Sequence, residues 1–118
     1  MLKQILLVGA GGAVGSILRF LASVFIVRSE PWPFPIATFL VNILGCFCIG
    51  IFANLIPSNN LRFLLITGFC GGFTTFSTFA SENMFLINNN QTFIAVIYII
   101  ASVVIGLGAV WLGMHITK

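Results

Sequence analysis

Four long apolar stretches, separated by short polar segments, account for most of the chain. They cover approximately residues 4–27, 35–55, 61–87 and 93–115. Each is long enough for a helix that crosses a bilayer, which needs ~20 mostly apolar residues. Because only short segments remain between them, the pattern predicts an all-α integral membrane protein in which residues 1–118 form one four-helix domain.

The composition agrees with a location in the membrane. The chain has 118 residues, of which 59% are hydrophobic and 6% are charged, and its mean hydropathy is +1.17. Soluble domains carry about 25% charged residues. A chain this short has too little interior to hide its apolar side chains, so its surface must face lipid. The formal net charge of +3 is spread out without a basic run, so no nucleic-acid partner is expected.

The few charges bear on how the helices insert. Four spans place the N-terminus, the second loop and the C-terminus on one side, with Lys3, Arg62 and Lys118. The other side has Arg28 and Glu30. This bias in Lys and Arg is weak, so both orientations in the membrane are plausible. Two oppositely oriented copies would then form an antiparallel, dual-topology dimer, which is an inverted-repeat architecture.

The first span combines small residues with a charge. Gly11 and Gly15 form a GxxxG spacing, which lets another helix approach closely. Arg19 lies deeper in the same span, where a charge must reach water, a partner or a headgroup. Two interpretations remain for Arg19. It either extends its side chain to the membrane surface or lines an aqueous vestibule that attracts anions.

A polar face runs along the second span. Thr38, Asn42 and Gly45 recur at i, i+4 and i+7, which places them on one side of a helix. The amide of Asn42 is expensive to leave unpaired in hydrocarbon. It is therefore expected either to join two helices by hydrogen bonds or to line a pore as a donor.

The third span contains the most unusual stretch, residues 68–79, which read GFCGGFTTFSTF. The adjacent glycines Gly71 and Gly72 favour a break in the helix, because glycine weakens helical propensity. Backbone freed at membrane depth is tolerated only where it is buried in protein or lines a cavity. The carbonyl oxygens at such a break are hard ligands that suit Na⁺.

Hydroxyl groups and aromatic rings follow the glycines. Phe76 and Phe79 are three residues apart and share a face, and Glu82 follows on roughly the same side. The electropositive edge of a phenyl ring can stabilise a small anion without a charge that would trap it. The hydroxyl groups of this stretch belong to Thr74, Thr75, Ser77 and Thr78.

The fourth span has two polar residues on one face, Tyr98 and Ser102, which are four residues apart. The three cysteines, Cys46, Cys48 and Cys70, lie in apolar segments. They are interpreted as small buried residues, with no role in disulfides or metal binding.

Three of these segments resemble motifs of the Fluc/CrcB family of fluoride channels, in the same order and over nearly the whole chain. The stretch GFCGGFTTFSTF at 68–79 resembles the family's hallmark. The glycine-rich stretch 11–20 resembles its first helix, and PIATFLVNILG at 35–45 resembles its second-helix motif. One departure is Ala37, where the family usually has glycine, which concerns packing at the helix start and no pore group.

This resemblance implies an antiparallel homodimer of four-helix subunits with two fluoride pores. It also implies a structural Na⁺, which is not transported, at the centre of the dimer. The main-chain carbonyls of Gly71 and Thr74 would bind this ion from both subunits. A multi-pass protein of the bacterial cell membrane is implied as well.

The resemblance also assigns pore residues by position. Asn42 would be the fluoride-coordinating amide, and Phe76 and Phe79 would be the pore phenylalanines. At Gly106 the track on the fourth helix lacks a hydroxyl that relatives often carry. The remaining polar residues of the pore would be Thr75, Ser77, Thr78, Tyr98 and Ser102, with Arg19, Thr38 and Glu82 as vestibule or supporting residues.

The expected function is passive export of toxic fluoride from the cytoplasm, because no coupling site is evident. The alternative is a small multidrug-type transporter, which has a similar size, four helices and dual topology. Such a transporter needs a carboxylate in its first helix, where this chain has Arg19 and no acid. An enzyme is not expected, since no nucleophile–base pair and no cluster of metal ligands is evident in the sequence.

Overall fold

The computed structural model describes residues 1–29 and 33–118, and this part of the chain contains helices and no strands. Glu30 and the side chain of Arg28, which the charge bias counts on one side of the membrane, lie outside what the structure describes. The segments are α1 (Leu2–Ser29), α2 (Ile36–Leu55), α3 (Asn59–Arg62), the π-helix η1 (Phe63–Cys70), α4 (Gly71–Phe73), α5 (Phe76–Asn88) and α6 (Thr92–Ile116).

Four candidate membrane spans follow from these segments, so the prediction of four long apolar helices is confirmed. They are α1, α2, α6 and a composite span over Asn59–Asn88, which is called the third span below. The third span runs through α3, η1, α4 and α5 and is interrupted before Phe76. The predicted bend in the third helix is therefore present.

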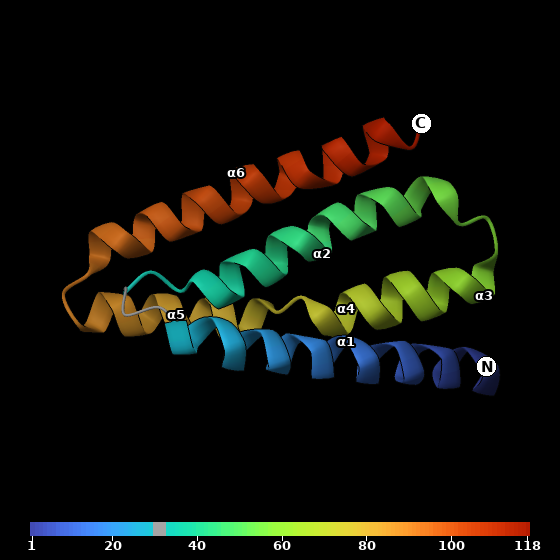
Figure 1. The fold of residues 1–118 in the computed structure, drawn as a ribbon, viewed down its shortest axis with the longest axis horizontal. Helices are drawn as coiled ribbons and strands as arrows, with labels where there is room; N and C mark the ends of the chain where they lie inside the picture. The colour runs from blue at the N-terminus through green and yellow to red at the C-terminus, as the bar shows by residue number, and fades with distance from the viewer. Residues whose placement is uncertain (30–32) are drawn as a thin grey trace.

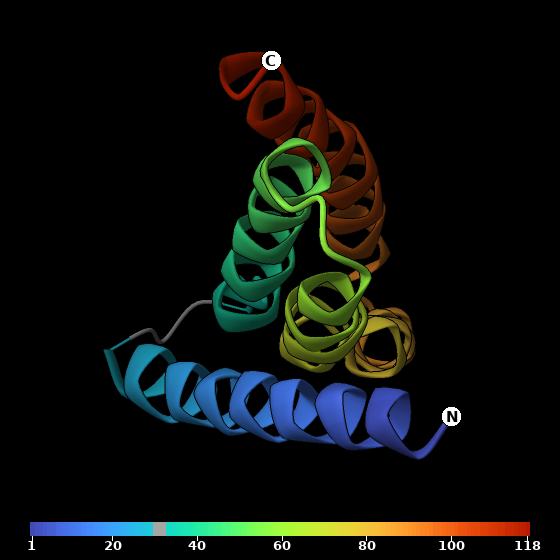
Figure 2. The ribbon, with the colours of Figure 1, turned by 90° about the vertical axis from the view of Figure 1, so that its right-hand side faces the viewer.

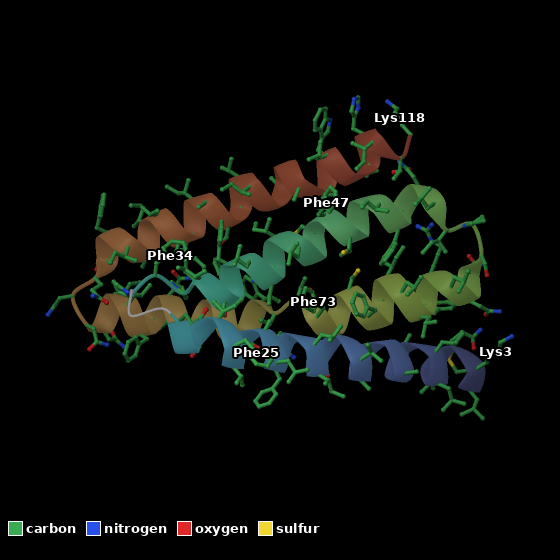
Figure 3. The ribbon with its side chains drawn as sticks, viewed as in Figure 1. Lys3, Phe25, Phe34, Phe47, Phe73 and Lys118 are labelled. Atoms are coloured by element: carbon green, nitrogen blue, oxygen red, sulfur yellow. The ribbon has the colours of Figure 1, made fainter. Side chains whose placement is uncertain are left out.

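The helices pack as two pairs, which Figures 1 and 2 show from two directions. One pair is α1 with η1 and α4, and the other is α2 with α6. The second half of the third span is α5, which lies against α6 and so connects the two pairs. Both chain termini and the connection from α2 to α3 lie at the same end (Figure 1). Lys3 and Lys118 lie at this end (Figure 3).

Glycines bring the backbone of α1 into contact with the third span. A Cβ atom on Gly11 would overlap the carbonyl oxygen of Leu64 and lie 2.8 Å from the Phe69 nitrogen. A Cβ atom on Gly15 would likewise overlap the Phe69 carbonyl oxygen. The close approach predicted from the GxxxG spacing is confirmed, and its partner is the first half of the third span.

The largest fully buried side chains are Tyr98 and Cys70. Tyr98 belongs to a small core with Leu86 and Ala95, at the end of the molecule where α5 meets α6. Phenylalanines pack around it, including Phe34, whose position between the helices is visible in Figure 3. Many other apolar side chains, such as Phe25, are exposed, as expected for helices that face lipid.

We expect Gly11→Ala to destabilise the fold, because the added methyl group has no room between the two backbones. Overpacking of this kind costs about 1–3 kcal/mol. The matched control is Gly9→Ala in the same helix, where a Cβ atom would meet nothing within 4 Å. Thermal unfolding in detergent micelles, followed by circular dichroism, should show a lower midpoint for Gly11→Ala only. Equal midpoints for the two variants would contradict the assigned contact.

Candidate functional site

The interruption of the third span consists of Thr74 and Thr75. Both residues have extended backbone, with φ −83° and ψ 157° at Thr74 and φ −148° and ψ 121° at Thr75. The sequence predicted a break from Gly71 to Thr74, which is correct at Thr74 and wrong at Gly71 and Gly72. Gly71 is helical, with φ −63° and ψ −37°, and Gly72 lies inside α4.

Packing explains why glycine occurs at position 72 without a break in the helix. A Cβ atom on Gly72 would lie 2.6 Å from the carbonyl oxygen of Gly12 in α1. The residue therefore permits contact between two helices, and its backbone stays helical. Glycine in a membrane helix is consistent with either role, so the sequence alone does not separate them.

The side chain of Asn42 in α2 holds the interruption in place. Its Oδ1 accepts a hydrogen bond from the Thr75 nitrogen at 2.8 Å, and its Nδ2 donates to the Thr75 carbonyl oxygen at 3.1 Å. One amide thus satisfies both backbone groups of a residue that has left the helix. Unpaired backbone groups are costly at membrane depth, so this pair of bonds stabilises the extended segment.

These bonds leave two main-chain carbonyls without their usual donors. In an α-helix, the N–H group of residue i+4 bonds to the carbonyl of residue i. The Thr75 N–H group bonds to Asn42, so it is diverted from Gly71. The Thr78 N–H group bonds to Thr75 Oγ1 at 3.3 Å, so it is diverted from Thr74. These are the two carbonyls named above as Na⁺ ligands, and oxygen donors of this kind suit a hard cation.

Arg19 bonds to the end of the first half of the third span. Its Nε donates to the Gly72 carbonyl oxygen at 3.0 Å. A cation is stabilised at the C-terminal end of a helix by the partial negative charge of the free carbonyls. Arg19 also lines a cavity of about 150 Å³ together with Thr38, Thr75 and Thr78. Its side chain is therefore directed towards the interruption, next to several predicted polar residues.

A larger cavity, of about 300 Å³, lies on another side of Thr75, between α2, α5 and α6. Several residues that the sequence singled out from three different spans meet there. Ser102 lines it, and Ser102 Oγ is buried without a hydrogen-bond partner among the described residues. Its lining is Asn42, Cys46, Ile49, Thr74, Thr75, Phe76, Phe79, Ser102 and Val103.

The two phenylalanines of the larger cavity adjoin each other. The ring centroids of Phe76 and Phe79 are 5.8 Å apart. Phe79 also makes an edge contact with Tyr98, at 4.9 Å between centroids. Phe76 is 78% exposed, so one face of the cavity opens at the outer surface of the bundle.

Glu82 lies next to this aromatic group and accepts two hydrogen bonds. Thr38 Oγ1 donates to Oε2 at 2.8 Å, and the Tyr98 hydroxyl donates to Oε1 at 2.9 Å. The contact connects α2, α5 and α6 through one carboxylate. The Tyr98 hydroxyl is consequently directed towards Glu82, and Tyr98 does not line the larger cavity with Ser102.

The remaining hydroxyls begin α5. Thr75 Oγ1 caps this helix by accepting from the Thr78 nitrogen, and it donates to Thr78 Oγ1 at 3.2 Å. Ser77 is exposed, with its Oγ 3.4 Å from Thr75 Oγ1, and lines neither cavity. These residues form a local cap whose geometry requires Thr75 outside the helix.

The cysteines differ from the interpretation of all three as buried residues. Cys70 is fully buried, whereas Cys46 and Cys48 are partly exposed. Sequence reasoning missed that Cys46 lines the larger cavity. The signal was present, because Cys46 is four residues after Asn42 and so shares its face. Among the described residues, no group of His, Cys, Asp and Glu is arranged to bind a metal ion.

Known proteins resemble the chain over nearly its whole length. Residues 6–114 match the family of CrcB-like proteins, Camphor Resistance (CrcB). The chain belongs to this family.

Several relatives of this CrcB-like chain are named "Fluoride-specific ion channel FluC". One from Azobacteroides pseudotrichonymphae is 47% identical, over 100% of this chain and 98% of its own length. Another from Flavobacterium psychrophilum is 45% identical, over 99% of this chain and 98% of its own length. A third from Phocaeicola vulgatus is 43% identical, over 99% of this chain and 100% of its own length. With its four apolar spans, the chain is a multi-pass membrane protein of a bacterial family.

We expect Asn42→Ala to destabilise this CrcB-like protein by leaving both backbone groups of Thr75 unpaired. Each unsatisfied group costs roughly 1–3 kcal/mol. Hydrogen–deuterium exchange at the Thr75 amide should accelerate in the variant. The control is Asn54→Ala, because Asn54 is exposed and its bond to the Met114 carbonyl oxygen is not at the interruption. Unchanged exchange at Thr75 in Asn42→Ala would show that Asn42 does not hold the segment.

Proposed function

We propose that the chain forms a fluoride-selective channel that exports fluoride passively from the cytoplasm. The observation that supports this most directly is the larger cavity, which combines an amide, an unpaired hydroxyl and two phenyl rings beside an interrupted helix. Relatives that carry the name of a fluoride-specific ion channel match the chain over its full length. The proposal therefore has independent support from geometry and from relatedness.

The cavity offers donors that suit a small anion. Asn42 Nδ2 uses one of its two N–H bonds for the Thr75 carbonyl, and the other remains for an ion. Ser102, whose hydroxyl has no partner among the described residues, lines the same cavity. The first turn of α5 also has N–H groups without partners inside the helix, at its positive end. Fluoride is strongly hydrated, so a pore must replace its water with such donors.

The phenyl rings would let the ion pass without holding it. A ring edge carries partial positive charge and no formal charge. Phe76 and Phe79 follow the amide along the cavity wall, one helical turn apart in α5. A site that combines donors with ring edges admits an anion and still releases it. A negative potential inside the cell then drives fluoride outwards, at about 2.3 kcal/mol per charge per 100 mV.

A structural Na⁺ is part of this proposal. The carbonyl oxygens of Gly71 and Thr74 have lost their helical donors, as described above, and are suited to a hard cation. Two carbonyls fill only part of a cation's coordination shell, and a second copy would add two more. Arg19, which bonds to the neighbouring Gly72 carbonyl, occupies the adjacent oxygen. The ion would fix the interruption and would not move through the pore.

We further propose that the working unit is an antiparallel homodimer. Gly71, Phe76 and Ser77 are exposed on the single chain at the middle of the third span. The Ser77 hydroxyl and the backbone at Gly71 are polar groups that are expensive to leave in lipid, and a second copy would cover them together with Phe76. An inverted partner would bring the same three residues to the same depth, because they lie near the middle of the span.

Reconstituted protein is expected to conduct fluoride and to exclude chloride. Efflux from proteoliposomes loaded with either salt, followed with ion-selective electrodes, measures both. Absence of a fluoride flux, or an equal flux of chloride, would contradict the proposed function. A proton-coupled flux of organic cations would instead support a multidrug-type transporter.

The pore assignment is tested with phenylalanine variants in the same assay. Phe76→Ile and Phe79→Ile keep apolar bulk but remove the ring edges, so each should lower the flux by about tenfold or more, equivalent to ~1.4 kcal/mol. Phe93→Ile should conduct normally, because Phe93 is 76% exposed and lines neither cavity. Normal flux in the first two variants would remove the assignment of the pore but not the channel.

We expect the termini to be found on both sides of the membrane in cells. A cysteine-specific, membrane-impermeant label on a single cysteine added at the N-terminus, in a variant without native cysteines, should react partly from each side. Reaction from one side only would contradict an antiparallel homodimer. The fluoride assay would be unaffected by that outcome, so the two proposals can fail separately.

A further inference from the structure

We infer that the thiol of Cys46 forms part of the path of the permeating ion and donates its S–H to it. This inference rests on the proposed function and gives a role to a residue that the sequence pattern predicted to be merely small and buried. It follows from three observations on α2 and α6, which concern the wall of the larger cavity, its unpaired hydroxyl and the space above one glycine.

The first observation is the position of Cys46 in the cavity wall. It lies on the same face of α2 as Asn42, one helical turn further along, and both residues line the larger cavity. Cys46 is partly exposed, although it lies in an apolar membrane helix. A thiol in this position has contact with the same space as the amide.

The second observation is on the facing helix. Ser102 lines the same cavity, and its buried Oγ has no hydrogen-bond partner among the residues described. A buried hydroxyl without a partner is unusual and indicates an absent water or ligand. A polar guest in the cavity would supply a partner for this hydroxyl, and Cys46 borders the same space.

The third observation is the absence of a side chain at Gly106, one turn beyond Ser102. A Cβ atom built there would lie 3.5 Å from Cys46 Sγ and 3.9 Å from Ile43 Cδ1. The sulfur is thus the nearest atom to the space that a side chain at this position would enter. Gly106 itself is buried and does not line the cavity, so the thiol that borders the cavity also packs against the backbone of α6 at this position.

The chemistry of a thiol suits a weak contact with an anion that has to move on. An S–H group is a weaker donor than a hydroxyl, so it binds an anion less tightly than Ser102 does. A sequence of strong and then weaker donors lets an ion enter and leave. Because the thiol is neutral when protonated, it adds no charge to the path. Its sulfur is also a selective target for reagents, which makes the position testable.

The chain supplies its own controls in the two other cysteines. Cys48 is two residues from Cys46 and so points to a different side of α2, and it does not line the larger cavity. Cys70 is fully buried. The double variant Cys48→Ala/Cys70→Ala isolates the cavity thiol, and Cys46→Ala isolates the other two.

The test is fluoride efflux from proteoliposomes before and after treatment with methyl methanethiosulfonate. The cysteine thiolate attacks the reagent's sulfenyl sulfur, so an S–S bond to a methylthio group forms and methanesulfinate leaves. The reaction removes the S–H donor and narrows the cavity. Treatment should lower the flux at least about tenfold in wild type and in the double variant, whereas Cys46→Ala should keep its untreated rate.

A second comparison needs no reagent. Cys46→Ser should retain flux within roughly threefold of wild type, because it keeps a donor. Cys46→Ala should lose roughly three- to tenfold, as expected for one hydrogen bond to an ion. If Cys46→Ala does not fold, reagent sensitivity in the double variant and its loss in Cys46→Ser/Cys48→Ala/Cys70→Ala still decide the matter.

The outcomes separate the two levels of inference. A wild-type protein without fluoride flux would overturn the proposed function. A wild-type protein that conducts fluoride, but whose double variant is modified at Cys46 by mass spectrometry and still conducts fully, would overturn the role of Cys46 alone. Failure of the reagent to modify Cys46 at all would also overturn it, because a thiol in the ion path must be accessible.

Discussion

The rest of the structure depends on one constraint, which is that backbone groups in the middle of a membrane must find partners within the protein. The third span leaves the helical conformation at Thr74 and Thr75, and the amide of Asn42 satisfies both backbone groups of Thr75. Without such a partner the extended segment would be unstable. Both cavities and the start of α5 follow from this interruption, because each includes Thr75.

The same constraint explains the small residues of α1. The first half of the third span lies against α1 so closely that Gly11 and Gly72 have no room for a side chain. This contact fixes the half-helix that ends at Phe73 and holds Arg19 near its terminal carbonyls. The bundle therefore uses backbone contact and a few polar bonds at its centre, while the aromatic core around Tyr98 lies near one end.

Much of the fold was predictable from the sequence, because hydropathy and the length of the apolar stretches determine four spans. The shared face of Thr38, Asn42 and Gly45 was also predictable, since helical spacing places them together, and all three contact the third span. The position of the break was not, because glycine serves close packing and helix breaking equally well. Only the tertiary bond from Asn42 decides that Thr75 leaves the helix. The exposure of Cys46 likewise depends on how α6 lies beside α2.

The meeting of the two cavities at a single residue has a genetic consequence. The two cavities have only Thr75 in common and approach it from between different helices, and the same side chain caps α5. A substitution at Thr75 therefore alters the walls of both cavities and the start of α5 at once, so no variant at this position can separate the three.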